Sequence, residues 1–261
     1  MSHEETTRAR FAETAALLAS HGEARVEPTR ERLRRFLAPR GEERTIDVGT
    51  GTGMLAFALA PLVGEVVGID LVPEMLDHGR RASIEYPNIV FLQGDALALP
   101  FSDAEFDLAV TSRTFHHLTR PELALAEMTR VTRLGGRLLV IDQLTSVDPL
   151  EAFAHNRIEH LRDPSHVRVL SDQDFRGLFE ANWLVLERFE VESEETELDE
   201  FLDRAACSGP ARAEVIAEVE RLIAADRSAG VALRRSGGGY AMTLSVGWYL
   251  VRRVAAPSVE V

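Results

Sequence analysis

From residue 44 to residue 142, short apolar runs alternate along the chain with longer runs that have helical spacing. "RTIDV" and "EVVGID" are strand-like, and each is followed by a run with apolar residues three or four positions apart, "GMLAFALAPL" and "PEMLDHGRRASIE". Such alternation is typical of βαβ units, in which helices cover both faces of a parallel sheet. The pattern therefore predicts an α/β fold with a doubly wound sheet.

The chain before this region is helical in pattern. Residues 1–40 contain two amphipathic runs that stop at Gly22 and at Pro39. These helices are predicted to form either a lid over a ligand or part of the core. Residues 41–261 are predicted to form the main domain.

The chain after this region mixes helices and strands. Helical patterns occur within 143–182, and a helical, acidic insertion is predicted at 197–229. The run at 238–252 alternates strictly between apolar and other positions, which predicts a half-buried closing strand. The residues expected on its apolar face are Tyr240, Met242, Leu244, Val246, Trp248 and Leu250.

Composition narrows the choice of partners. The formal net charge is -13 and the sequence pI is about 5.1, which argues against nucleic acid, because such binding depends on neutralising phosphates. The single cysteine, Cys207, excludes an internal disulfide. No stretch approaches the ~20 apolar residues of a membrane span. We expect a soluble cytoplasmic protein, whose oligomeric state stays open with a homodimer among the options.

The segment "RTIDVGTGTGML" joins a predicted strand to a predicted helix through Gly49, Gly51 and Gly53. Glycines let the backbone approach a ligand closely, and the following helix presents free N–H groups. A dinucleotide site has the spacing G-x-G-x-x-G, whereas here the third glycine comes one residue early. The turn predicts a cofactor site that departs from the dinucleotide pattern.

Asp47 decides between the two cofactor classes that bind such a turn. It lies two residues before the first glycine, where its carboxylate points toward the ligand. A carboxylate repels a pyrophosphate but attracts the ammonium and sulfonium of S-adenosylmethionine, by about 4 kcal/mol at ~4 Å and an effective dielectric of 20. The sequence therefore predicts a cationic cofactor.

Two more carboxylates follow at the ends of the next strands. Asp70 ends "VVGID", where it can accept from both ribose hydroxyls, as it also would in a nicotinamide site. Asp95, expected to end the third strand and followed by Ala96, can accept from an adenine amino group. The three carboxylates are predicted to form one pocket at the carboxyl edge of the sheet.

With "FDLAVTSRTFHHL" and "VTRLGGRLLVID", these motifs resemble the class I S-adenosylmethionine-dependent methyltransferases, particularly the small-molecule branch typified by the ubiquinone/menaquinone C-methyltransferases. The resemblance covers roughly residues 44–142. It implies a Rossmann-like sheet of seven strands with an antiparallel last strand, and S-adenosyl-L-methionine as cofactor. The insertion at 197–229 is an elaboration of the family pattern, and its helices are expected to cap the acceptor site. The positions that match the family's cofactor site are Asp47, Gly49, Thr50, Gly51, Gly53, Asp70, Leu71, Asp95, Ala96 and Ser112.

Candidate residues for the methyl acceptor follow the fourth strand. "SRTFHHL" places Arg113, His116 and His117 at the same sheet edge. A histidine can take a proton from an acceptor near neutral pH, and His116 is the predicted catalytic residue. Because adjacent helical residues do not share a face, only one of the two histidines is expected to line the site.

A second candidate segment, "RDPSH", resembles one in a subset of the same branch. It predicts that Arg162 and His166 line the acceptor pocket and face an anionic or phenolic substrate, or else that the segment is simply an Asp-Pro turn at a helix end. Its histidines have the wrong spacing for a standard ligand set, so no metal site is predicted.

The combined prediction is a methyltransferase that uses S-adenosyl-L-methionine, releases S-adenosyl-L-homocysteine and methylates a small molecule. Two alternatives stay open: an NAD(P)-dependent oxidoreductase, and a binding module that holds the cofactor without turnover. The acceptor atom is not identified by the sequence, because acceptor pockets are built from the variable elements of such folds.

Overall fold

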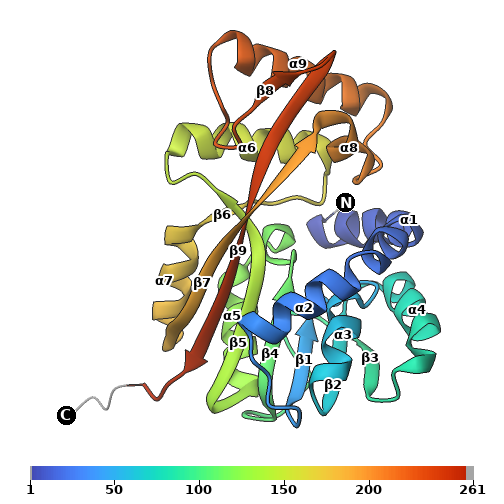
Figure 1. The fold of residues 1–261 in the computed structure, drawn as a ribbon, viewed down its shortest axis with the longest axis vertical. Coiled ribbons are helices and arrows are strands. Elements are labelled where there is room, and N and C mark those ends of the chain that lie inside the picture. The colour runs from blue at the N-terminus through green and yellow to red at the C-terminus, as the bar shows by residue number, and fades with distance from the viewer. Residues whose placement is uncertain (1, 257–261) are drawn as a thin grey trace.

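The computed structural model describes residues 2–256 and is built around one mostly parallel sheet (Figure 1). Along its main path the strand order is β3-β2-β1-β4-β5-β9-β7. β1 to β5 pair in parallel, whereas β9 is antiparallel to both β5 and β7. The strands are β1 (Arg44–Val48), β2 (Glu65–Asp70), β3 (Ile89–Gln93), β4 (Phe106–Ser112), β5 (Thr132–Thr145), β7 (Leu184–Glu197) and β9 (Gly239–Arg253).

Two short strands correct the expected number of seven. β6 (Leu170–Ser171) pairs with β5, and β8 (Arg234–Ser236) pairs with β9, so the described part of the chain forms a nine-stranded sheet. Strands of two or three residues are too short to show a period-two pattern, which is why the sequence does not indicate them. The predicted doubly wound sheet and antiparallel closing strand are confirmed.

The helices of the described residues begin at recognisable signals. Ser2 and Ser171 form capping boxes with Glu5 and Asp174, and proline occurs in the first turn of α4, α5, α6 and α9. The α-helices are α1 (His3–Glu23), α2 (Val26–Phe36), α3 (Met54–Leu59), α4 (Pro73–Ala82), α5 (Pro121–Val131), α6 (Pro149–Arg162), α7 (Asp172–Ala181), α8 (Leu198–Asp203) and α9 (Gly209–Ala224).

The sheet is covered by helices on both faces. On one face, Leu139 and Ile141 of β5 pack with residues of α2, α3 and α4. On the other face, Leu138 and Val140 of the same strand pack with residues of α5 and α7. Because successive side chains of a strand point to opposite faces, a continuous apolar run such as "LLVI" supplies both cores.

β9 is buried on both faces, which corrects the expectation of a half-buried strand. The predicted apolar face is buried, with Trp248 and Leu250 packed beside α2 and α3. On the opposite face, Tyr249 and Val251 are also buried, against α5 and α7. β9 lies between β5 and β7, and its neighbours carry helices over both faces, so neither face of this stretch reaches solvent.

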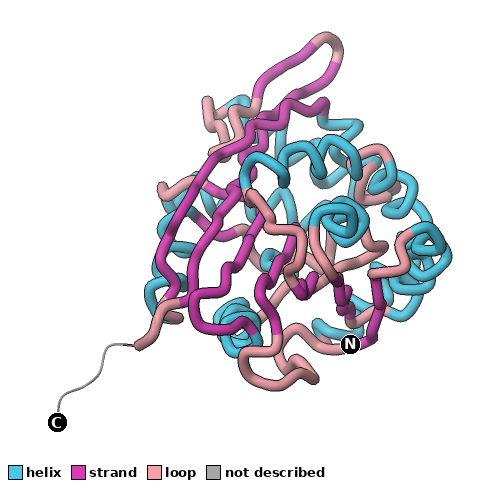
Figure 2. The backbone as a smooth tube through the Cα atoms, turned by 60° about the horizontal axis from the view of Figure 1, so that its bottom comes forward, coloured by secondary structure: helices cyan, strands magenta, loops and turns pink. Residues whose placement is uncertain are grey.

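The far ends of β7 and β9 carry a second, smaller core. Both strands run past the main sheet toward α6, α8 and α9, and a strand hairpin projects there (Figures 1 and 2). Ile158 of α6, Leu202 of α8 and Val219 of α9 pack with Met242 and Leu244 of β9. The segment predicted as a helical insertion thus contains α8 and α9.

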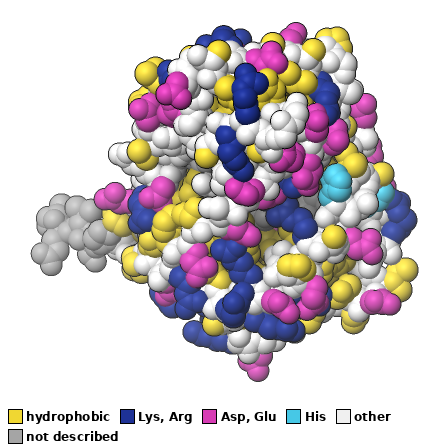
Figure 3. All heavy atoms as spheres, turned by 45° about the horizontal axis from the view of Figure 1, so that its top comes forward, with side chains coloured by type: hydrophobic (Ala, Val, Ile, Leu, Met, Phe, Trp, Pro, Cys, Tyr) yellow, Lys and Arg dark blue, Asp and Glu magenta, His cyan; other side chains and the backbone are white. Residues whose placement is uncertain are grey.

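Charged side chains of both signs are interspersed on the face shown in Figure 3. Among residues 2–256, no helix combines the length and the apolar character that crossing a membrane requires.

Candidate functional site

The glycine turn joins β1 to α3 at the carboxyl edge of the sheet. Gly49, Gly51 and Gly53 have φ values of 70°, 57° and 94°, a conformation that glycine adopts without steric cost. A Cβ atom on Gly49 would lie 2.4 Å from Oγ1 of Thr114, so this position also lacks room for a side chain. Gly53 is the N-cap of α3, which places the free N–H groups of that helix directly after the turn.

Asp47 is buried at the end of β1 and keeps one oxygen without a partner. Asp47 is 1% exposed, and its Oδ2 accepts a hydrogen bond from Oγ1 of Thr50 at 2.7 Å. Burial raises the pKa of Asp47 to about 7, with a further contribution from the charge of Asp70. The N–H of Ala56 lies near the carboxylate, but within the described chain no hydrogen bond reaches Oδ1. A buried acceptor without a partner is costly, so Oδ1 suits a cationic donor on a ligand.

Asp70 holds the glycine turn from the end of β2. Its Oδ2 accepts from the N–H of Gly51 at 2.8 Å and its Oδ1 from the N–H of Val72 at 3.0 Å. Burial raises the pKa of Asp70, and these backbone donors oppose the rise. Because a carboxylate offers about four acceptor sites, Asp70 can position the turn and still accept from ligand hydroxyls.

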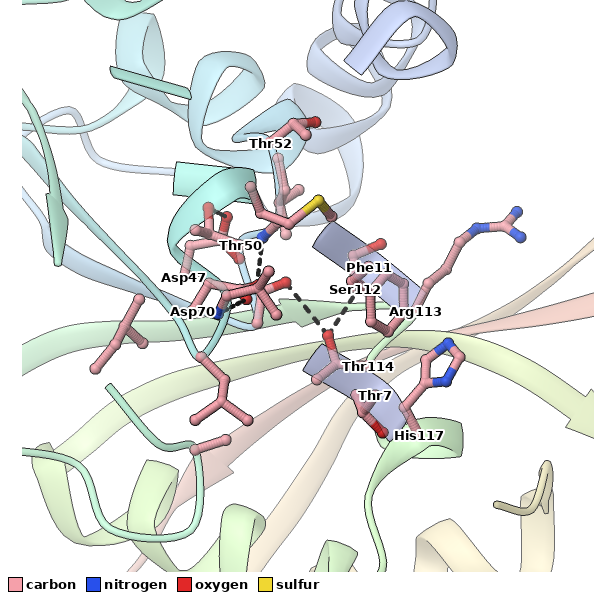
Figure 4. A pocket seen from close by; sticks show the side chains of 18 of the residues that line it. Thr7, Phe11, Asp47, Thr50, Thr52, Asp70, Ser112, Arg113, Thr114 and His117 are labelled. Atoms are coloured by element: carbon pink, nitrogen blue, oxygen red, sulfur yellow. Dashed lines mark hydrogen bonds between the residues drawn. The ribbon is translucent and has the colours of Figure 1, made fainter. Parts of the chain in front are cut away.

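These side chains line a cavity of about 260 Å³, here called the first cavity. Figure 4 shows Asp47, Thr50 and Asp70 on one side of it and Arg113 and His117 on the other. The predicted cofactor residues that line the first cavity are Asp47, Gly49, Thr50, Gly51, Asp70, Leu71, Asp95, Ala96 and Ser112.

Two of the predicted cofactor residues differ from expectation. β3 ends at Gln93, so Asp95 follows the strand by two residues, and its Oδ1 accepts the N–H of Leu97 at 2.8 Å in a tight turn. Gly53 does not line the first cavity, because a Cβ atom there would point into Phe91, 2.7 Å from its ring. Gly53 instead starts α3 and lets that helix pack closely on the sheet.

Helix α1 covers the first cavity from above the sheet edge. Thr7, Phe11 and Leu18 line the cavity, while Ala15 packs against Met75 of α4. The N-terminal helix therefore both covers the cavity and contributes to the core, the two roles that the sequence left open.

A second cavity of about 200 Å³ adjoins the first one. The two cavities share Phe11, Leu18, Arg113 and His117 as lining residues. These four residues form the boundary between the two cavities, here called the junction.

His116 lines the second cavity and is held by a buried carboxylate. It is 8% exposed, and its Nδ1 lies 2.5 Å from Oδ1 of Asp142. The other oxygen of Asp142 accepts the N–H of Phe115 at 2.8 Å. With Nδ1 engaged, Nε2 is the ring nitrogen left over, and nothing in residues 2–256 hydrogen-bonds to it. The arrangement of a histidine oriented by a carboxylate is suited to proton transfer.

His117 lines both cavities, so the expectation that only one histidine would face the site is wrong. The two residues lie on a 3₁₀ turn (Phe115–His117) rather than an α-helix, and their rings pack with centroids 4.3 Å apart. Nδ1 of His117 donates to the backbone carbonyl of Ser165 at 3.0 Å. Burial and the neighbouring His116 lower the pKa of His117 to about 4, so its ring is neutral at pH 7.

Arg113 lies at the junction in a strained backbone conformation. Its φ is 54°, which is uncommon for a residue other than glycine. Its Nη2 lies 2.9 Å from Oε2 of Glu194 on β7, and Glu194 also pairs with Arg204. Burial alone would raise the pKa of Glu194, but the two guanidinium groups lower it to about 2.

Of the two residues predicted from "RDPSH", one lines the second cavity and one does not. Arg162 lines it and is anchored by Glu159 at 2.6 Å. His166 lines neither cavity, because the loop after α6 turns its ring inward, where Nε2 lies 3.3 Å from Oδ1 of Asn156 and the ring stacks on His116. Among the described residues, no group of three or more His, Cys, Asp or Glu side chains is placed to hold a metal.

Several residues that line the second cavity, or that pair with its lining residues, are absent from the sequence prediction. Asp142 lies in a strand-like run and could have been found as a carboxylate within an apolar strand. The others carry no local signal, since they come from helices and strands far apart in the chain. These residues are Arg10, Arg25, Gln143, Glu194 and Arg204.

The strand order with an antiparallel closing strand, and a cavity floored by a glycine turn and acidic strand ends, define the class I methyltransferases. Residues 46–140 match the family model described as a methyltransferase domain. The chain belongs to this methyltransferase family.

Two relatives illustrate the similarity. The uncharacterized methyltransferase YcgJ of Bacillus subtilis (strain 168) is 32% identical over 179 residues, which cover 68% of this chain and 71% of the relative. The crystal structure of YcgJ superposes with a TM-score of 0.79 and covers 90% of this chain and 100% of that one, at 24% identity. The ubiquinone/menaquinone biosynthesis C-methyltransferase UbiE of Roseobacter denitrificans is 37% identical over 118 residues. That match covers 43% of this chain and less than half of the relative, 47%.

Proposed function

We propose that this protein transfers a methyl group from S-adenosylmethionine to a small-molecule acceptor. The observation that carries the proposal is the buried carboxylate of Asp47. This residue lines the first cavity, and its Oδ1 lacks a hydrogen-bond partner within residues 2–256. A cationic ligand satisfies this oxygen, whereas a pyrophosphate would be repelled by it. The relatives named for quinone biosynthesis support a small molecule as acceptor.

The cofactor would be held by residues that the structure gathers around the first cavity. Asp47 and the glycine turn, with Thr50, would take the methionine end, and Asp70 the ribose. Asp95 and Ala96 would take the adenine, while Leu71 and Ser112 complete the wall. When bound, S-adenosylmethionine supplies a methyl group on a positively charged sulfur, so the transfer needs positioning and exclusion of water more than acid or base help.

The residues of the second cavity supply what an acceptor needs. An acceptor that loses a proton can give it to Nε2 of His116, while Asp142 fixes the ring orientation and stabilises the protonated form. Phe11 and Leu18, both on α1, line the junction of the cavities, where their apolar side chains would exclude water. His117, neutral and bonded to the Ser165 carbonyl, positions the acceptor there.

Calorimetric titration tests the cofactor assignment. S-adenosylmethionine and S-adenosylhomocysteine are expected to bind with one-to-one stoichiometry, NADH is expected not to bind, and Asp47→Ala should lose the binding. Asp77→Ala is a matched control, because Asp77 is an exposed carboxylate on α4 that pairs only with Arg80 among the described residues. Binding of NADH alone would favour an oxidoreductase. Tight cofactor binding with no methyl loss over a broad acceptor panel would favour a binding module.

A further inference from the structure

The second cavity has a basic wall in an otherwise acidic protein. Its lining residues include Arg10, Arg25, Arg113, Arg162 and Arg204. Among the described lining residues, Asp163 is the one acidic side chain. The whole chain has a net charge of -13. The wall is therefore a local cluster of positive charge in a protein that is negatively charged overall.

The carboxylates that pair with these arginines do not neutralise all of them. Arg113 and Arg204 share Glu194, and Arg204 also pairs with Glu200. Arg162 pairs with Glu159, and Arg10 reaches Asp163 at 3.5 Å. Arg25 has no ion pair within residues 2–256. Repulsion from Arg113, followed by burial, lowers the pKa of Arg25 to about 10, which is the direction expected when neighbouring cations are not fully neutralised.

Uncharged polar groups of the cavity also lack partners. Gln143 of β5 is 6% exposed and lines the cavity, yet its side-chain amide makes no hydrogen bond to the described residues. His116, 8% exposed, likewise keeps Nε2 free of any described partner. Because both residues line the cavity, their free polar groups are available to a polar ligand between them and the arginines.

We infer that the second cavity binds the methyl acceptor through an anionic group, a carboxylate or a phosphate, held by Arg25 and Arg113. This inference rests on the proposed function, since it assigns the acceptor class of the same site. A guanidinium donates two parallel hydrogen bonds to either anion. Arg113 lines both cavities, so an anion on Arg113 brings the rest of the acceptor to the junction, beside His116 and His117.

The second cavity has room for a ring compound. A cavity of about 150 Å³ holds a benzene ring, so the second cavity, at about 200 Å³, has space for one ring with a small charged substituent. A ring that carries an anionic group is therefore a suitable probe of this cavity.

Three ring compounds of similar size test the inference: benzoate, phenyl phosphate and benzyl alcohol. Each is titrated into protein saturated with S-adenosylhomocysteine, which closes the first cavity to them. We expect benzoate or phenyl phosphate to bind at least roughly tenfold more tightly than benzyl alcohol, because a charge-assisted hydrogen bond contributes about 1.5 kcal/mol or more. The tighter of the two anions distinguishes a carboxylate from a phosphate. Added salt should weaken only the anions.

Variants locate the binding. Arg25→Gln and Arg113→Gln should each reduce the preference for the anion, while Arg34→Gln, an exposed arginine of α2 outside the cavity, should keep it. No preference for the anions, or a preference that survives in both cavity variants, overturns the inference while S-adenosylhomocysteine binding upholds the proposed function. Failure of S-adenosylhomocysteine to bind overturns both.

Discussion

Replacing Asp47 by asparagine is predicted to weaken cofactor binding and to stabilise the protein without ligand. Asparagine keeps an oxygen that can accept the Thr50 hydroxyl, which lies 2.7 Å from Oδ2 in the wild type. It removes the negative charge that faces the first cavity. The carboxylate that is proposed to bind the ligand thus destabilises the folded protein when no ligand is bound.

The size of this cost follows from the pKa of Asp47, raised from 3.8 to about 7 by burial and by the charge of Asp70. Each pKa unit corresponds to 1.36 kcal/mol, so ionised Asp47 destabilises the folded state by about 4 kcal/mol above pH 7. The folded pKa is the higher one, so the destabilisation grows as the pH rises from the unfolded pKa to the folded one. Between about pH 5 and about pH 8 it grows by roughly 2–3 kcal/mol.

Thermal unfolding of the unliganded proteins measures this effect. The melting temperature of Asp47→Asn relative to the wild type should rise with pH, by about 2–4 °C for each kcal/mol in a chain of this size. The pH trend isolates the ionisation from the cost of burying the asparagine amide, which is constant. Calorimetry should show S-adenosylhomocysteine binding weakened roughly 10- to 100-fold, as for the loss of a charged hydrogen bond. A melting difference that does not change with pH, or undiminished binding, would refute the reasoning.

Three further predictions concern the same sites. In the wild type, affinity for S-adenosylhomocysteine should fall roughly tenfold for each pH unit below about 7, because protonation of Asp47 competes with the ligand's ammonium. An affinity of the wild type that does not change with pH would contradict this prediction. The affinity of Asp47→Asn, which cannot ionise at this position, should not change with pH. Gly49→Ala should lower the melting temperature and the cofactor affinity, because its φ is 70° and its Cβ atom would meet Thr114, whereas Gly135→Ala, with φ 73° and open space, should show only the backbone strain of about 1–2 kcal/mol. His116→Gln and Asp142→Asn should each reduce kcat roughly 100-fold for an acceptor that loses a proton, with S-adenosylhomocysteine affinity unchanged; equal kcat values would remove His116 from proton transfer.

The cofactor half of the site could be predicted because its parts are local in the chain. One strand and the turn after it carry Asp47, Gly49 and Gly51. Their spacing alone predicts a strand that ends in a glycine turn. Asp70 ends β2, which pairs with β1, and Asp95 follows β3, which pairs with β2. Since parallel strands bring their carboxyl ends to one edge, the alternating pattern was sufficient to place these residues in one cavity.

The errors have equally physical causes. The sequence pattern of β9 showed one apolar face. Burial of the opposite face depends on the position of β9 between β5 and β7, and the pattern of a single strand does not reveal its place in the sheet. Gly53 belongs to the glycine motif, yet it packs against Phe91 because of the way α3 meets the sheet. His166 stands beside Arg162 in sequence, but a turn of the loop buries its ring behind His116.

The sequence by itself determined the α/β class, the family and most of the strand-end and turn residues of the first cavity, because these depend on local backbone geometry and on short spacings. Only the tertiary structure decided the composition of the second cavity, where arginines from α1, from the α1–α2 junction and from the ends of β4, α6 and α8 meet around Gln143 and His116. No periodicity links residues so far apart in the chain. Their convergence follows from the packing of α1 against α4 and of α8 against β9 and β7, and packing between distant elements is a property of the folded chain alone.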